Sequence, residues 1–192
     1  MIISLWCDVD IAHYIAYNFL HIGNFSCLTI SLRCDIIIIN HVRERKLNMN
    51  TIKPYKRRVY YYETDKMGIM HHSNYIRIFE ESRVNFLIQV GMPMEQIEAQ
   101  GILMPVLSVD CKYKSPLRFD EEFAVYPKIV KFNGTTLELD YRIVSCESGK
   151  LCVEGHSSHC FTDTELKPVR TKLKFPDIYR LFADHNGADI MD

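Results

Sequence analysis

The stretch Tyr60–Tyr75, YYYETDKMGIMHHSNY, decides the fold expected for this chain. It joins a strand-like aromatic run to a lone acid, Asp65, then to a turn at Gly68 and the start of a long amphipathic helix. This order places a carboxylate beside the backbone N–H groups of a helix N-terminus, which attract developing negative charge. A carboxylate in that position can act as nucleophile or general base. The stretch therefore indicates acyl-transfer chemistry on a small α+β scaffold.

The helix that follows is predicted over Asn74–Val90, with Ser73 or Asn74 as its N-cap and Gly91 at its C-terminal end. Apolar side chains recur at helical spacing on one face, around the small Ser82. The members of this stripe are Tyr75, Phe79, Phe86 and Val90.

The helix also carries four charged side chains. Arg77 and Glu81 are expected to form a solvated i,i+4 pair. Arg83 falls toward the apolar face, where it is expected to pair with Glu80 or to extend its head into solvent.

The remaining segments alternate with a period of two, which predicts strands. A curled antiparallel sheet of about five strands, wrapped around one central helix, buries both with one core. Pro127 indicates an edge or a bulge, and Asn133-Gly134 indicates a two-residue hairpin. The strands are predicted at Lys56–Glu63, Leu107–Tyr113, Glu122–Phe132, Leu137–Ile143 and Lys150–Thr162, with short helices at Met94–Gln100 and Phe175–Phe182.

Composition narrows the class of protein. The 192 residues are 47% hydrophobic and 24% charged, as expected for a globular domain plus an extension. A net charge of −1 and the lack of a long basic run give no reason to expect nucleic acid as a partner. The seven cysteines are odd in number and form no CxxC pair, which favours a reducing, cytoplasmic location.

Residues 1–48 differ from the rest because no sustained period emerges in them. They are expected to be an N-terminal extension that is non-native or disordered, ahead of a folded domain at 49–192. In this hypothesis translation begins at Met49, and the intact mass of the natural protein tests it. The alternative is a membrane anchor at Ile11–Leu32, which lacks Asp, Glu, Lys and Arg but contains several polar residues that weaken it.

Residues 59–83, VYYYETDKMGIMHHSNYIRIFEESR, resemble the first strand and helix entry of hotdog-fold acyl-CoA thioesterases. The likeness is to the 4-hydroxybenzoyl-CoA thioesterase family, in particular its small bacterial acyl-CoA thioester hydrolase branch. It covers about residues 55–182 and includes the later Lys114–Leu117 segment and the Asn133-Gly134 hairpin. The resemblance implies a single hotdog domain that needs no metal or redox cofactor. It also implies a homodimer or homotetramer with its active site at a subunit interface.

The same resemblance implies roles for individual residues. Asp65 is the catalytic acid, which attacks the thioester carbonyl or activates water, and His72 and Tyr61 lie near it. Backbone N–H groups around His72 and Ser73 polarise the thioester oxygen. From the residues alone, Asp65 could instead cap a turn, His72 could pack at the helix end and Tyr61 could belong to the core. Glu80 and Glu81 lie too deep in the helix to be preferred as catalysts.

Candidate substrate-binding residues carry weaker signals. Ser73 and Asn74 can bind substrate or water at the helix entry, although capping explains Asn74 as well. Lys114 and Arg118, with the nearby Lys112, can bind the phosphates of coenzyme A or simply form a solvated face.

No metal site is predicted. His156, His159 and Cys160 are the best cluster of metal-ligating residue types. Strand alternation puts the two histidines on opposite faces, and no second paired cluster completes a site.

The function expected is hydrolysis of an acyl-CoA to a free acid and coenzyme A. One alternative on the same scaffold is an acyl thioester hydratase or dehydratase, with His72 as base. Another is a non-catalytic acyl-binding module in which Asp65 is structural. The motif does not distinguish coenzyme A from acyl carrier protein as the carrier, nor does it define the acyl group.

Overall fold

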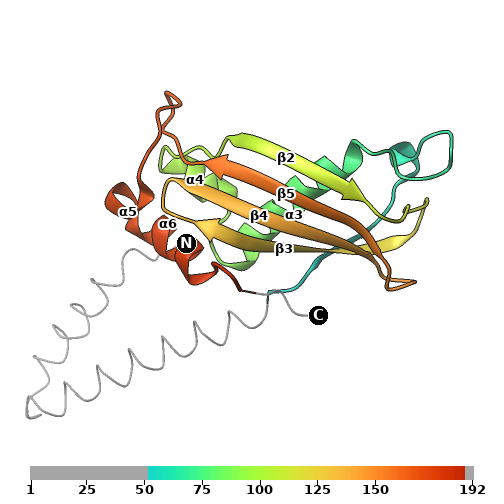
Figure 1. Cartoon of the computed structure of the whole chain (residues 1–192). Coiled ribbons are helices and arrows are strands. Elements are labelled where there is room, and N and C mark those ends of the chain that lie inside the picture. The colour runs from blue at the N-terminus through green and yellow to red at the C-terminus, as the bar shows by residue number, and fades with distance from the viewer. Residues whose placement is uncertain (1–51, 189–192) are drawn as a thin grey trace, which may run out of the picture. The chain divides into compact units, whose positions relative to one another are not determined.

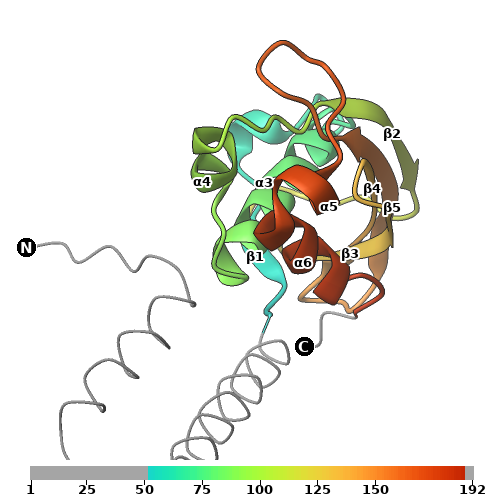
Figure 2. The same ribbon diagram turned by 90° about the vertical axis from the view of Figure 1, so that its left-hand side faces the viewer.

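A computed structural model describes residues 52–188, in which five antiparallel strands curl around one long helix, as predicted (Figures 1 and 2). The predictions for residues 1–48, including the anchor at 11–32, lie outside the described residues. The strands are β1 (Tyr55–Arg58), β2 (Val106–Tyr113), β3 (Glu122–Phe132), β4 (Thr136–Ser145) and β5 (Leu151–Cys160), in the sheet order β1-β3-β4-β5-β2. The helices are α3 (Asn74–Gln89), α4 (Met94–Ala99), α5 (Thr171–Lys174) and α6 (Pro176–Asp184), with a 3₁₀ turn η1 (Tyr61–Glu63).

Helix α3 ends where Gly91 makes a further helical turn unfavourable. Gly91 has a φ of +82°, its N–H donates to the Ile88 carbonyl, and the Met92 N–H donates to the Leu87 carbonyl. This pair of bonds is a Schellman motif, in which the left-handed residue is usually glycine. The prediction that Gly91 ends the helix is confirmed.

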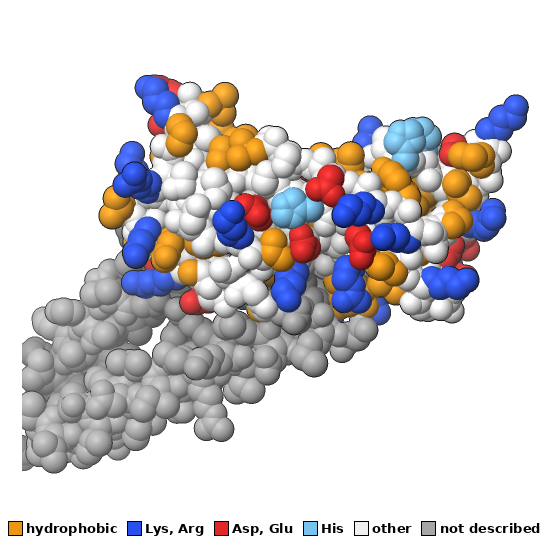
Figure 3. All heavy atoms as spheres, in the orientation of Figure 1, with side chains coloured by type: hydrophobic (Ala, Val, Ile, Leu, Met, Phe, Trp, Pro, Cys, Tyr) orange, Lys and Arg blue, Asp and Glu red, His pale blue; other side chains and the backbone are white. Residues whose placement is uncertain are grey.

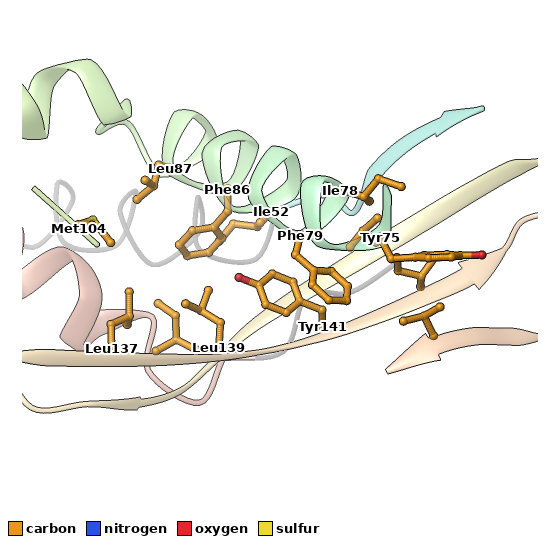
Figure 4. Close-up of a cluster of buried hydrophobic side chains, with 14 of the residues drawn as sticks. Ile52, Tyr75, Ile78, Phe79, Phe86, Leu87, Met104, Leu137, Leu139 and Tyr141 are labelled. Atoms are coloured by element: carbon orange, nitrogen blue, oxygen red, sulfur yellow. The ribbon is translucent and has the colours of Figure 1, made fainter. Parts of the chain in front are cut away.

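The concave face of the sheet packs on the apolar stripe of α3. Phe79 and Tyr141 stack with their ring centroids 4.4 Å apart and their planes 15° from parallel (Figure 4). Gly155, opposite Tyr141 on β5, leaves room for the Phe79 ring, because a Cβ atom there would overlap that ring. The small residue thus sets how closely the sheet approaches the helix.

The convex face of the sheet is charged. Lys131 pairs with Glu138, and His156 lies 2.7 Å from Asp140, on the face opposite His159. Figure 3 shows acidic and basic side chains intermingled over this face. The predicted placement of His156 and His159 on opposite faces is confirmed.

The first predicted strand is wrong after Arg58. The chain turns at Tyr60 and forms η1, because the Glu63 carboxylate reaches back to the Tyr60 N–H at 2.9 Å. Tyr60 and Tyr62 then stack on each other, with ring centroids 5.5 Å apart, and all three tyrosines are exposed. A favourable local hydrogen bond has overridden the strand preference of the aromatic run.

The hairpin at Asn133-Gly134 exists but is longer than predicted. Phe132 pairs with Leu137, which leaves four residues between them. The Asn133 side chain accepts hydrogen bonds from the Thr135 and Thr136 amides, and the Gly134 carbonyl binds Thr171. Contact with the start of α5, which is distant in sequence, stabilises the wider turn.

Pro127 lies where a proline is tolerated in a sheet. Strand β1 pairs with β3 only as far as Tyr55–Val125, so Pro127 has no β1 residue opposite it. A register irregularity follows between Ile129 and Lys131. The predicted edge is confirmed for this half of β3.

Candidate active site

Asp65 opens a tight hairpin between η1 and α3. The Asp65 N–H donates to the Ile69 carbonyl, and the Gly68 N–H donates to the Asp65 carbonyl, both at 2.9 Å. Gly68 has a φ of +70°, as the last residue of this type of three-residue loop requires. The predicted turn at Gly68 is confirmed.

The Asp65 carboxylate also serves its own turn. Its Oδ1 atom accepts a hydrogen bond from the Met67 N–H at 2.8 Å, and the side chain is half-buried. The capping role considered for Asp65 is therefore real. It leaves the second carboxylate oxygen, Oδ2, available for another partner.

Glu63 joins this hairpin to the start of α3. Its carbonyl accepts hydrogen bonds from the His71 N–H at 2.8 Å and from the Asn74 side chain at 2.9 Å. Asp65 lies two residues beyond this point along the hairpin, which is about 7 Å at strand spacing. The carboxylate and the helix N-terminus therefore share one short, hydrogen-bonded frame.

The N-terminus of α3 uses a cap that the sequence did not indicate. Ser73 makes no side-chain capping bond to the helix. Instead, the His71 Nδ1 atom lies 2.9 Å from the Ser73 hydroxyl and accepts the Ser73 N–H at a longer 3.4 Å. His71, rather than Ser73, thus provides the side-chain contact at the helix start.

Asn74 and His72 have different surroundings. The Asn74 amide group is engaged by Glu63, so it braces the helix start rather than capping it. The His72 ring is exposed and packs on His71, with centroids 4.1 Å apart, and its carbonyl accepts the Tyr113 hydroxyl. Within residues 52–188, the His72 N–H has no backbone acceptor.

Tyr61 is not a core residue. Its side chain is 78% exposed and meets the edge of Phe119 at a centroid distance of 5.6 Å. No contact in the described structure brings Tyr61 to Asp65. The alternative that Tyr61 belongs to the core is wrong, and its predicted place in the site stays a prediction.

The two basic candidates differ in their relation to the Asp65 hairpin. The Arg118 backbone bridges to Ile69, and the Leu117 carbonyl accepts the Met70 N–H, so Arg118 lies beside this hairpin. The Lys114 ammonium pairs with Glu154 at 3.0 Å. Arg118 is therefore the better placed of the two.

Glu63 is the important residue that the sequence reasoning missed. Its carboxylate is 5% exposed and receives two hydrogen bonds from Arg57, at 2.7 and 2.8 Å. Burial alone would raise the pKa of this carboxyl, but the bonds from Arg57 and the Tyr60 N–H lower that pKa below its usual value. The signal available in the sequence was the position of Glu63, three residues after Tyr60, which is the spacing of a capping box.

Glu81 completes this network instead of pairing with Arg77. It accepts hydrogen bonds from the Arg57 Nε atom and the Tyr55 hydroxyl, both at 2.9 Å. The predicted Arg77–Glu81 pair is wrong because Arg57, from β1, lies closer. A groove of about 530 Å³ runs along this side of α3, lined by Tyr55, Arg77, Glu80, Glu81, Val84, Asn85 and Ile88, and it does not include Asp65.

Two structural features bear on metal ions and membranes. Residues 52–188 contain no group of three or more His, Cys, Asp or Glu side chains arranged to hold a metal ion. In that same part of the chain no helix is both long and apolar enough to cross a membrane.

Comparison with known proteins identifies relatives of this chain. The Bacillus subtilis protein YneP, provisionally named an acyl-CoA thioesterase, is 35% identical over 120 residues, which is 62% of this chain and 86% of that protein. The acyl-CoA thioester hydrolase YbgC of Escherichia coli O157:H7 is 27% identical over 111 residues, 58% of this chain and 83% of its own.

Solved structures agree with these relatives. A DHNA-CoA thioesterase from Staphylococcus aureus superposes with a TM-score of 0.66 at 28% identity, over 69% of this chain and 89% of that one. A hypothetical protein from Aquifex aeolicus superposes with a TM-score of 0.60 at 32% identity, over 65% of this chain and 97% of that one. The model of the thioesterase-like superfamily matches residues 59–180, and the chain belongs to this hotdog-fold family.

Proposed function

We propose that this protein is an acyl-CoA thioesterase that hydrolyses an acyl-CoA to a carboxylic acid and coenzyme A. The observation that carries the proposal is the frame built on Glu63, which holds the Asp65 turn and the N-terminus of α3 together. Membership of a thioesterase-like family favours hydrolysis over hydration or simple binding of the acyl group. The names of the relatives favour coenzyme A as the carrier.

Asp65 supplies the reactive carboxylate in this proposal. Its Oδ1 atom is held by the Met67 N–H, so Oδ2 attacks the thioester carbonyl carbon or removes a proton from water. The His72 N–H, which has no backbone acceptor within residues 52–188, stabilises the negative charge that develops on the carbonyl oxygen. The dipole of α3 adds to this stabilisation.

In this proposal coenzyme A binds beside the Asp65 hairpin and the N-terminus of α3. Arg118, beside the Asp65 hairpin, contacts a phosphate of the substrate, and Lys114 contributes only when Glu154 releases it. Ser73 and the exposed His72 ring face the reacting group. Asn74 acts indirectly, by bracing the helix start.

A second copy of the chain completes the enzyme in this proposal. Among residues 52–188, strand β2 pairs only with β5, so within this part of the chain its outer edge has unpaired backbone groups. Val106 and Leu107 on this strand are each more than half exposed. Pairing of two such edges about a twofold axis would bury these side chains in a homodimer.

Release of free thiol from a panel of acyl-CoA substrates tests the catalytic proposal. Asp65→Asn keeps the turn, because asparagine can accept the same Met67 hydrogen bond, but removes the reactive carboxylate. We expect the turnover of this variant to fall about 10²- to 10⁴-fold.

Asp163→Asn is the matched control. Asp163 also accepts an N–H two residues ahead, from Glu165, in a different loop, and its variant should keep full activity. Equal thiol release by Asp65→Asn and the unmodified protein would remove Asp65 from the mechanism. Water addition to an enoyl-CoA without thiol release would favour the hydratase alternative.

A further inference from the structure

Arg83, in the third turn of α3, is a buried cation with no ion-pair partner among residues 52–188. It is 6% exposed, and its Nη1 atom has no hydrogen-bond partner within residues 52–188. None of the carboxylates in that part of the chain forms an ion pair with it, so the predicted pairing with Glu80 is wrong. Burying an unpaired charge strongly destabilises a protein. The guanidinium is therefore suited to an anionic group that the described chain does not supply.

The groups around Arg83 are polar, and none of them is an anion. The Tyr141 hydroxyl lies 2.9 Å from the Ser157 hydroxyl, which lies 2.8 Å from the His159 Nε2 atom. His159 is 2% exposed, and its Nδ1 atom has no hydrogen-bond partner among the described residues. Figure 4 shows the Tyr141 hydroxyl directed toward the C-terminal half of α3. Hydrogen-bond donors thus gather at one buried point.

The charge of Arg83 is felt by these neighbours. Burial, and then Arg83, lower the pKa of His159 to about 4, so its imidazole is neutral at pH 7. Burial raises the pKa of Tyr141, and the hydrogen bond with Ser157 and the charge of Arg83 only partly offset this, so the hydroxyl keeps its proton. The cluster therefore carries one net positive charge at neutral pH.

The partly exposed inner face of β2 offers a path from the helix entry toward this cluster. Val109 is opposite Ser157 in the sheet, and Tyr113 packs its ring on Tyr75 of α3 at 5.5 Å, so both side chains face inward. They nevertheless remain 38% and 50% exposed. The Tyr113 hydroxyl binds the His72 carbonyl, so the path begins at the helix entry.

The length of this path suits an extended acyl chain. Arg83 is nine residues after Asn74, which is about 14 Å along the helix axis. The stacked Phe79 and Tyr141 rings between these points are both 2% exposed, so the apolar surface offered to methylene groups is that of Val109 and Tyr113 on β2.

We propose that Arg83 binds the terminal carboxylate of the acyl group, so that the substrates are medium-chain ω-carboxyacyl-CoA thioesters. This inference rests on the proposed thioesterase function. The guanidinium forms charge-assisted, bidentate hydrogen bonds with the carboxylate, and Ser157 and His159 contact its remaining lone pairs. Specificity follows, because a neutral acyl chain leaves the buried cation unpaired.

The test compares kcat/KM for suberoyl-CoA with that for octanoyl-CoA, and for sebacoyl-CoA with decanoyl-CoA. The unmodified protein should prefer the carboxylated member of each pair. Arg83→Met should reduce this preference ratio about 10- to 100-fold, as expected for loss of a charged hydrogen bond. Arg180→Met, which alters an exposed arginine on α6, is the matched control and should leave the ratio unchanged.

Free suberate provides a readout that does not depend on catalysis. It should raise the Tm of the unmodified protein but not that of Arg83→Met, whereas octanoate should show no such difference. The Tm of Arg83→Met without ligand should equal or exceed that of the unmodified protein, because a buried unpaired charge has been removed.

These outcomes separate the two proposals. If octanoyl-CoA is hydrolysed but the unmodified protein shows no preference for suberoyl-CoA, or Arg83→Met keeps that preference, the role of Arg83 is refuted and the thioesterase function stands. If no thioester releases thiol, the thioesterase function fails. The rise in Tm with suberate then decides whether Arg83 binds a carboxylate. A rise in the unmodified protein but not in Arg83→Met supports the site. No rise in the unmodified protein refutes the site.

Discussion

At the scale of single residues, Glu63 explains why Asp65 is where it is. Its carboxylate neutralises the buried Arg57, and its carbonyl holds both His71 and Asn74. The neighbouring residues of the ETD triplet therefore have separate tasks. Glu63 holds the frame in place, and Asp65 occupies the turn that the frame presents.

Replacement of Glu63 should destabilise the fold. Glu63→Gln leaves Arg57 buried with Glu81 as its remaining carboxylate, so we expect a loss of about 3 kcal/mol in the free energy of unfolding. Urea denaturation measures it. Glu165→Gln breaks an exposed pair with Lys167 and should cost less than about 0.5 kcal/mol. Similar losses for the two variants would contradict the role given to Glu63.

His159 should make stability depend on pH. Its folded pKa of about 4 lies below the usual 6.5, so the unfolded chain binds a proton first as the pH falls. The contribution is complete above pH 6.5 and is lost between pH 6.5 and 4, by an amount on the order of 3 kcal/mol.

Urea unfolding of the unmodified protein and His159→Gln across this pH range tests the prediction. The free energy of unfolding of the unmodified protein should fall, relative to that of His159→Gln, as the pH drops from 6.5 to 4. His156→Gln, which alters a histidine on the charged convex face, should follow the unmodified protein. Parallel curves for the unmodified protein and His159→Gln would show that His159 titrates normally.

At the scale of elements, local pattern was a good guide to periodic segments and a poor guide to their ends. Strand β3 was predicted with its observed bounds, and α3 within one residue, because each repeats its period over many residues. The Tyr60–Glu63 run failed because one carboxylate bond outweighed the strand preference of three tyrosines. A hairpin predicted from Asn133-Gly134 was widened by Thr171, which local sequence does not reveal.

The contact between α3 and the sheet depends on Gly155. Gly155→Ala should destabilise the protein by about 1–3 kcal/mol, because its new Cβ would overlap the Phe79 ring. Thermal unfolding of the single and double variants measures the effect. In a Phe79→Leu background the same substitution should cost less, since the smaller side chain makes room. Additive losses would show that Phe79 is not the obstacle.

At the scale of the whole molecule, strand order decides which surface is open. Strand β2 follows α3 and α4 in the chain but pairs with β5, the last strand, and so forms one edge of the sheet. Both the proposed dimer contact and the proposed path to Arg83 use this strand. In these proposals its outer edge would face a second copy, and its inner face would line the path.

The proposed homodimer has a direct test. Light scattering should give a mass twice the 22.5 kDa of one chain. Val106→Lys with Leu107→Lys should yield a monomer, because charged side chains prevent pairing between strand edges. Leu173→Lys on α5, at a residue that is also exposed, should leave the dimer intact. A monomeric unmodified protein, or a dimer that survives both lysines, would exclude this interface.

The amino-acid sequence by itself determined the α+β class, the central helix, the alternating strands and the order of acid, glycine turn and helix start. These features depend on periodicity and on the conformations of single residues, which act over a few neighbouring positions. The tertiary structure alone decided that Glu63 is the centre of the frame, that β2 is an edge, and that Arg83 is buried beside His159. Each of these depends on a partner that is distant in the chain, and a periodic pattern does not specify which charges meet or which remain unpaired.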